Sequence, residues 1–320
     1  MTTARTTRPG QSAPVPPSPT PVRWLPARVQ TLGWLRGLAV ASVAVNVLIV
    51  VTGGAVRLTD SGLGCPTWPK CTDASLTPTK QYAIHGLIEF GNRQLTFVLA
   101  VVAVATWLVA MALRRERALA TVAALGIPAQ AVLGGLTVLT HLNPWLVALH
   151  FLLSMAIIAV TFVLWWRLRA APPRDAVPAP AALLAWATLA VTAVTLVLGT
   201  IVTGSGPHAG DADASGKVHR TGLQVSSMAQ LHADAVMVLV GLTVGLLALV
   251  YALRAPAAVR GTVAVLLGVE AAQAVIGYTQ YFLHVPPLLV ALHMLGACVV
   301  WLAALRVVLT VRARPVTTAG

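Results

Sequence analysis

Long apolar segments constrain this chain more than any other feature. They consist mainly of Ala, Val, Leu and Gly, and short polar segments separate them. About 20 apolar residues suffice for a helix that crosses a bilayer, and these runs lack the two-residue alternation of strands. The sequence therefore predicts an all-α membrane protein with eight transmembrane helices, at 34–56, 83–112, 118–140, 145–168, 181–203, 226–253, 259–282 and 286–310.

The placement of charge indicates how these helices are oriented. The chain carries 22 Lys and Arg against nine Asp and Glu, but the basic residues are spread over several loops instead of forming a nucleic-acid patch. Cytoplasmic loops hold an excess of Lys and Arg, so we expect a multi-pass plasma-membrane protein with both termini cytoplasmic and no nucleic-acid partner. Residues 1–33, rich in Pro, Ser and Thr, are predicted to form a disordered cytoplasmic tail. Of the 22 basic residues, sixteen fall on the side of the termini. The six on the other side are Arg57, Lys70, Lys80, Arg93, Lys217 and Arg220.

An internal repeat relates the two halves of the chain. The segment PAQAVLGGLTVLTHLNPWLVALH (128–150) aligns without gaps with AAQAVIGYTQYFLHVPPLLVALH (271–293), so that His150 matches His293. We therefore expect two pseudo-symmetric four-helix bundles of parallel topology, formed by residues 34–170 and 181–311.

Histidines inside the apolar segments indicate a cofactor. An ionisable group in lipid is costly, so it usually faces a bundle interior, a cavity or a cofactor. His150, His232 and His293 lie one or two turns inside the outer ends of their predicted helices. Two imidazoles at matched depth on facing helices are what axial ligation of haem iron requires. We expect His232 and His293 to serve the second bundle, and His150 with a residue of helix 83–112 to serve the first.

The chain has three cysteines, two of them close together in one outer loop. Cys65 and Cys71 lie in SGLGCPTWPKCTD, where an oxidising environment favours a disulfide and two thiolates are too few for a structural zinc site. We predict a Cys65–Cys71 disulfide, and the sequence leaves open whether it is redox-active. Cys298, in the last predicted helix, is expected to be a small buried apolar residue.

Several of these stretches together resemble the heme A synthase family. The resemblance implies an oxidoreductase that converts the C8 methyl group of heme O into a formyl group, by two hydroxylations and loss of water, to provide heme A for cytochrome oxidase. The residues that carry it are GGAVRLTDSGLGCPTWPKC (53–71), IHGLIEFGNR (84–93), QAVLGG…LVALH (130–150), LGTIVTGSGPHAGD (198–211), AQLHAD (229–234) and QAVIG…LVALH (273–293).

The resemblance also implies roles for single residues. Haem b is expected as a cofactor with His232 and His293 as axial ligands, and heme O as the substrate with its iron on His150. Glu89 matches a glutamate regarded as essential to the chemistry, and Arg93, four residues further on, is at the right spacing for an ion pair. The implied partners are the membrane, heme O synthase, the assembly of cytochrome oxidase and an unidentified electron donor. A homo-oligomer is left open.

Helix 83–112 departs from the usual Glu-x-x-His-Arg pattern of the family. Asn92 stands where a histidine is expected, which we interpret as an actinobacterial-like variant. Asn is a poor iron ligand, so either His150 alone serves the first haem site or His85 is its second ligand. His85 lies two helical turns outward from Asn92 and aligns roughly with His232 in the repeat. The sequence does not choose between these alternatives.

Two rival functions also remain. A diheme b-type membrane cytochrome that transfers electrons explains the paired histidines but gives Glu89 and the cysteine loop no role. A proton-coupled transporter with two structural repeats uses intramembrane His and Glu as a proton relay, and it predicts no haem.

Overall fold

The chain folds into long helices that run side by side. The computed structural model describes residues 25–79, 83–169, 177–212 and 216–312. These residues contain no strand, and they form eight helices that are long and apolar enough to cross a membrane. Every helix boundary lies within two residues of its predicted position, so the predicted fold class is confirmed. The helices are α1 (Leu32–Leu58), α2 (Ala83–Leu113), α3 (Arg117–Leu139), α4 (Pro144–Leu168), α5 (Ala179–Ser205), α6 (Val225–Ala252), α7 (Ala257–Phe282) and α8 (Pro287–Val311).

Local sequence signals explain where several helices begin. The Thr31 side chain caps α1 by accepting a hydrogen bond from the backbone N–H of Trp34 (3.2 Å). The Asn143 side chain caps α4 in the same way, with Trp145 as the donor (3.0 Å). Proline occupies the first turn of α4, α5 and α8, where its missing N–H costs nothing because that group has no partner within a helix.

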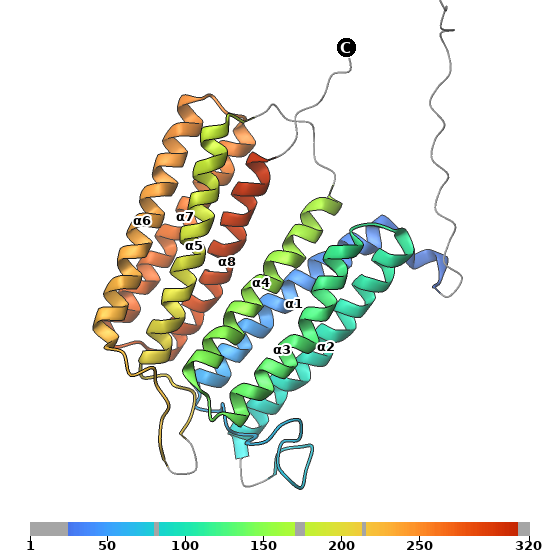
Figure 1. Ribbon diagram of the computed structural model, residues 1–320, viewed down its shortest axis with the longest axis vertical. Helices are drawn as coiled ribbons and strands as arrows, with labels where there is room; N and C mark the ends of the chain where they lie inside the picture. Colours follow the sequence, from blue (N-terminus) through green and yellow to red (C-terminus); the bar gives the residue numbers. More distant parts are fainter. Residues whose placement is uncertain (1–24, 80–82, 170–176, 213–215, 313–320) are drawn as a thin grey trace, which may run out of the picture.

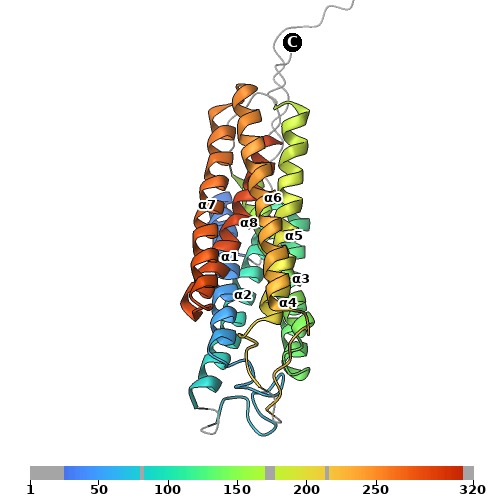
Figure 2. The same ribbon diagram turned by 90° about the vertical axis from the view of Figure 1, so that its left-hand side faces the viewer.

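The helices form two groups of four. In the first, α1 packs on α2, α2 on α3, α3 on α4, and α4 closes the ring on α1. The second group repeats this order with α5 to α8, and the two groups lie next to each other (Figure 1). The view turned by 90° shows that the helices of both groups follow the long axis of the molecule (Figure 2). The prediction of two pseudo-symmetric bundles agrees with this packing.

Equivalent residues of the two bundles make equivalent contacts. Gln130 Nε2 on α3 donates a hydrogen bond to the backbone O of His150 on α4 (3.1 Å). Gln273 Nε2 on α7 donates to the backbone O of His293 on α8 (2.9 Å). The repeat in the sequence is therefore a repeat of tertiary contacts.

The bundles meet through α1, α4, α5 and α8. Trp301 Nε1 on α8 donates a hydrogen bond to the backbone O of Met155 on α4 (2.9 Å). A methyl group placed on Gly54 of α1 would collide with the Met294 side chain of α8. Since glycine has no side chain, Gly54 allows these two helices to approach closely.

The two ends of the described chain lie at one end of the molecule, and the loops after α1 and α5 lie at the other (Figures 1 and 2). A one-turn 3-10 helix (Ala27–Val29) precedes α1. The predicted disordered tail falls largely on residues 1–24, which lie outside the described residues.

Candidate functional site

Each of the three intramembrane histidines rests on a glycine of the preceding helix. A methyl group placed on that glycine would lie 3.1 to 3.3 Å from the imidazole Cε1, closer than side chains normally pack. The absence of a side chain at these positions therefore makes room for the ring. The pairs are Gly134 with His150, Gly199 with His232, and Gly277 with His293.

The second bundle brings two of these imidazoles together. The ring centroids of His232 and His293 are 6.5 Å apart. Metal–imidazole bonds are about 2 Å long, so two rings that share one iron have their centroids roughly 6 Å apart. The backbone O of Thr195 accepts a hydrogen bond from His232 Nδ1 (3.1 Å), which leaves the Nε2 lone pair for a metal. The distance between the ring centroids therefore fits two imidazoles that share one haem iron.

The first bundle has one such histidine, with an asparagine at the corresponding place. His150 Nδ1 is buried and has no hydrogen-bond partner among the described residues. On α2, Asn92 accepts a hydrogen bond from Thr52 Oγ1 (2.8 Å), and its Nδ2 would lie 3.9 Å from a methyl group placed on Gly53 of α1. This contact between α1 and α2 is the counterpart of the glycine–histidine contact between α5 and α6.

His85 does not occupy the place expected from the rough alignment. It lies in the first turn of α2, where its ring is exposed and Nδ1 is hydrogen-bonded with Ser61 Oγ (3.0 Å). The rough alignment of His85 with His232 has no equivalent contact in the structure, because Asn92 faces the glycine of the neighbouring helix and His85 lies two turns further along α2. A role for His85 as a second iron ligand stays a prediction.

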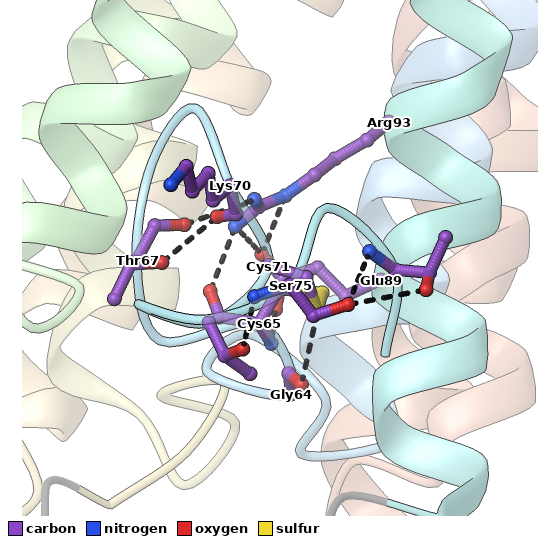
Figure 3. Close-up of a disulfide and its surroundings, with 10 residues drawn as sticks. Gly64, Cys65, Thr67, Lys70, Cys71, Ser75, Glu89 and Arg93 are labelled. Carbon is purple, nitrogen blue, oxygen red and sulfur yellow. Dashed lines mark hydrogen bonds and ion pairs between the residues drawn. A yellow bond between two sulfur atoms is a disulfide. The ribbon is translucent and has the colours of Figure 1, made fainter. Parts of the chain in front are cut away.

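Glu89 and Arg93 of α2 bind the loop that follows α1 (Figure 3). Glu89 is 5% exposed, and its Oε2 accepts a hydrogen bond from the backbone N–H of Cys65 (2.6 Å). Its Oε1 accepts from Arg93 Nη2 (2.5 Å), which forms the i, i+4 ion pair. Arg93 also donates to the backbone O atoms of Cys65, Thr67 and Lys70, at 2.7, 3.0 and 3.2 Å. The pair therefore holds the loop in place over α2.

The predicted disulfide between Cys65 and Cys71 is present, and both cysteines are buried. Trp68, between them in the chain, reaches α3. A methyl group placed on Gly135 would collide with the Trp68 indole, so the ring fills the space beside this glycine. Gly135 adjoins Gly134, on which His150 rests, so the loop and the imidazole contact neighbouring residues of α3.

Arg57, which the sequence indicated only as part of the charge pattern, links the two bundles. Its Nε donates a hydrogen bond to the backbone O of His208 (2.5 Å), and its Nη2 donates to Thr203 O (3.0 Å). Close by, the backbone N–H of Gly62 donates to Gly210 O (3.1 Å). The loop after α5 thus rests on the first bundle, next to the disulfide loop. These partners are about 150 residues apart in sequence, so no local pattern reveals them.

These features define a class: a multi-pass membrane protein made of two similar four-helix units, with imidazoles seated on glycines in their interior. Residues 36–305 match the family described as cytochrome oxidase assembly protein, and the chain belongs to this family.

Curated relatives of this chain are named heme A synthase. That of Lysinibacillus sphaericus is 36% identical over 136 residues, which are 41% of this chain and 44% of the relative. That of Geobacillus thermodenitrificans is 30% identical over 152 residues, 46% of this chain and 47% of the relative. That of Shewanella oneidensis is 26% identical over 189 residues, which are 54% of this chain and 56% of the relative. The chain spans about half the length of the curated relatives it matches.

Proposed function

We propose that this protein is a heme A synthase, an oxidoreductase that converts the C8 methyl group of heme O into a formyl group for cytochrome oxidase. The observation that carries the proposal is the difference between the bundles. The second bundle holds two imidazoles at the spacing of a shared iron, whereas the first holds His150, Asn92 and the buried carboxylate of Glu89. Membership of the cytochrome oxidase assembly family and relatives named heme A synthase support it.

The second bundle holds haem b in this proposal. His232 and His293 would hold its iron, and Gly199 and Gly277 leave room for the two rings. When bound, haem b supplies the one-electron redox chemistry that side chains lack. Thr195 accepts the Nδ1 proton of His232 and so keeps this imidazole in the tautomer that can bind a metal.

The first bundle binds heme O as the substrate. His150 ligates its iron, and its seat on Gly134 sets the direction of the ring. The amide of Asn92 has no basic ring nitrogen, so α2 would supply no second imidazole to this iron. We prefer this arrangement to ligation by His85, because His85 is engaged with Ser61 at the outer end of α2.

Glu89 lies one turn outward from Asn92 and gives the first bundle its acid–base group. Its two carboxylate oxygens are held by the Cys65 N–H and by Arg93, so the group has a fixed position. There it can exchange a proton with the substrate or stabilise a positive charge that develops on it. Arg93 positions Glu89 and joins it to the disulfide loop, which lies on the water side of the site.

The same asymmetry disfavours the rival functions. An electron-transfer cytochrome with two equivalent haems needs a second imidazole in the first bundle, where α2 instead presents Asn92. A proton-coupled transporter gives no reason for the spacing between His232 and His293.

Extraction of haems from cells tests the proposal. In a host that makes heme O but no heme A, the wild-type chain should produce heme A. Glu89→Gln keeps the shape of the side chain and removes its charge, so heme A should fall by roughly 100-fold or more, the range expected for a lost acid–base group. The reduced-minus-oxidised spectrum of haem b should remain. Glu116→Gln is the matched control, because Glu116 pairs with Arg167 outside this site.

The outcomes separate the candidates. Haem b without heme A in the wild type would favour the electron-transfer cytochrome. A colourless protein from haem-replete cells would favour the transporter. Unchanged heme A in Glu89→Gln would remove Glu89 from the mechanism and leave the activity standing.

The proposed location is the plasma membrane with both termini in the cytoplasm. Basic residues gather at the end where α1 begins and α8 ends, and such an excess stays cytoplasmic. Heme O synthase is the proposed source of the substrate. Conversion of a methyl group into a formyl group is an oxidation, so the reaction consumes an external oxidant and an oxygen source besides the electron donor still to be identified. Self-association is left open. The described basic residues at this end are Arg28, Arg36, Arg114, Arg115, Arg117, Arg167, Arg169, Arg254, Arg260, Arg306 and Arg312, against Arg57, Lys70, Arg93, Lys217 and Arg220 at the other.

A further inference from the structure

A cavity opens at the basic end of the molecule, far along the helices from the histidines. It lies where the ends of α4 and α8 meet the start of α7, and its volume is about 310 Å³. None of the described residues that line it is acidic. The lining residues that matter here are Trp166, Arg169, Gly261, Thr262, Arg306 and Thr310.

Two arginines line this cavity. The Arg169 guanidinium lies 3.2 Å above the centroid of the Trp166 ring, and this stacking fixes the plane in which its N–H groups point. Arg306, on α8, is exposed and forms no ion pair with another described residue. The N-terminus of α7 lies at the same place, and the positive end of its dipole adds to the attraction for an anion.

A buried hydroxyl in the lining points to a polar ligand. Thr310 is only 2% exposed, and its Oγ1 has no hydrogen-bond partner among the described residues. A buried hydroxyl without a partner costs free energy, so a ligand that supplies an acceptor would be stabilising. A methyl group placed on Gly261 would meet nothing within 4 Å, so this side of the cavity is open to an incoming group.

We infer that this cavity binds the phosphate of an anionic phospholipid from the adjoining leaflet. Arginine recognises phosphate through two or more N–H groups, and basic pockets between membrane helices bind lipid headgroups. A lipid fits better than a soluble anion because the cavity continues into apolar surface. Val265, one turn further along α7, lines it and is 51% exposed, which suits glycerol and acyl chains. The inference stands apart from the proposed enzyme activity, because it uses none of those residues.

Native mass spectrometry of the full-length protein tests this site. The protein in detergent is titrated with dioleoyl phosphatidylglycerol or with zwitterionic dioleoyl phosphatidylcholine, and bound lipid is counted. Phosphatidylglycerol should bind more tightly, and Arg169→Gln and Arg306→Gln should each weaken it about fivefold, as expected for one basic residue at a charged lipid surface. Arg114→Gln is the matched control, because Arg114 is exposed at the same end but lies outside the cavity.

Several results would overturn the inference. Equal binding of the two lipids would mean that charge is not recognised. An equal loss in Arg114→Gln would indicate a diffuse surface effect, and displacement of the lipid by millimolar inorganic phosphate would indicate a site for free anions. If an arginine variant folds poorly, Thr310→Val replaces it in the test, because valine keeps the shape of the side chain and removes the hydroxyl. This variant should weaken phosphatidylglycerol binding with no change for phosphatidylcholine.

Discussion

At the scale of single residues, glycine and histidine act as pairs in this protein. The imidazole of His293 rests on Gly277, and the position of this ring relative to His232 follows from that contact. A larger side chain at position 277 must move the ring, because well-packed helices leave no spare volume. We therefore expect the glycine to matter for the proposed haem site as much as the histidine does.

Gly277→Val should empty the proposed haem site of the second bundle while the helices remain. The added methyl groups meet His293 Cε1, and overpacking of this kind costs about 1–3 kcal/mol or displaces the ring. We expect haem b per protein, measured by the pyridine haemochrome, to fall about tenfold or more, with unchanged helix content by circular dichroism. Gly268→Val on the same helix is the control, because a methyl group there meets nothing within 4 Å. Full haem content in Gly277→Val would contradict the proposal that the His293 imidazole must pack against Gly277 for haem to bind.

At the scale of elements, α1 does more than complete the first bundle. Its last turn carries Arg57, whose guanidinium binds the end of α5 and the loop that follows. The two carbonyl groups that accept these hydrogen bonds belong to the second bundle. Loss of the arginine would leave Thr203 O and His208 O without their charged donor at the place where the bundles meet.

Arg57→Ala should lower thermal stability. Hydrogen bonds from a charged group contribute about 1.5–3 kcal/mol each, so we expect the unfolding midpoint to fall by roughly 5 °C or more. A thiol-reactive fluorescent dye reports unfolding, because Cys298 is the free cysteine and is buried. Arg220→Ala is the control, since Arg220 is exposed at the same end. An equal midpoint for the two variants would show that the link between the bundles contributes nothing to stability.

At the scale of the whole molecule, the distribution of basic residues defines two different ends. One end carries both termini of the described chain, and the other carries the disulfide loop and the loop after α5 (Figures 1 and 2). The polar loops that cover the first-bundle site therefore face the side opposite to the termini. The proposed orientation places this side outside the cell, where disulfides persist.

Labelling of single cysteines in intact cells tests this orientation. Val218→Cys lies in the loop after α5 and Arg115→Cys in the turn between α2 and α3, and both positions are exposed. A membrane-impermeant maleimide should label Val218→Cys in intact cells, and Arg115→Cys only after lysis. The wild type is the background control, because its free Cys298 is buried. The reverse labelling pattern would place the termini outside and refute the proposed topology.

Much of this architecture follows from the sequence alone. The apolar runs predicted each helix to within two residues, because a membrane span depends on local length and on local signals such as the caps at Thr31 and Asn143. The repeat around His150 and His293 indicated two like bundles, and the spacing of two cysteines in an outer loop indicated their disulfide. These features belong to segments that are short and continuous.

Only the tertiary structure decided which residues meet across helices. The placement of Asn92 rather than His85 opposite the α1 glycine depends on how far α2 is displaced along its axis relative to α1, because the two residues share one face of α2 and lie two turns apart. Arg93 binds the disulfide loop, and Arg57 binds the second bundle. Both contacts join segments that are far apart in the chain. Periodicity and composition act along the sequence, whereas these contacts are determined by packing between helices, which no local pattern specifies.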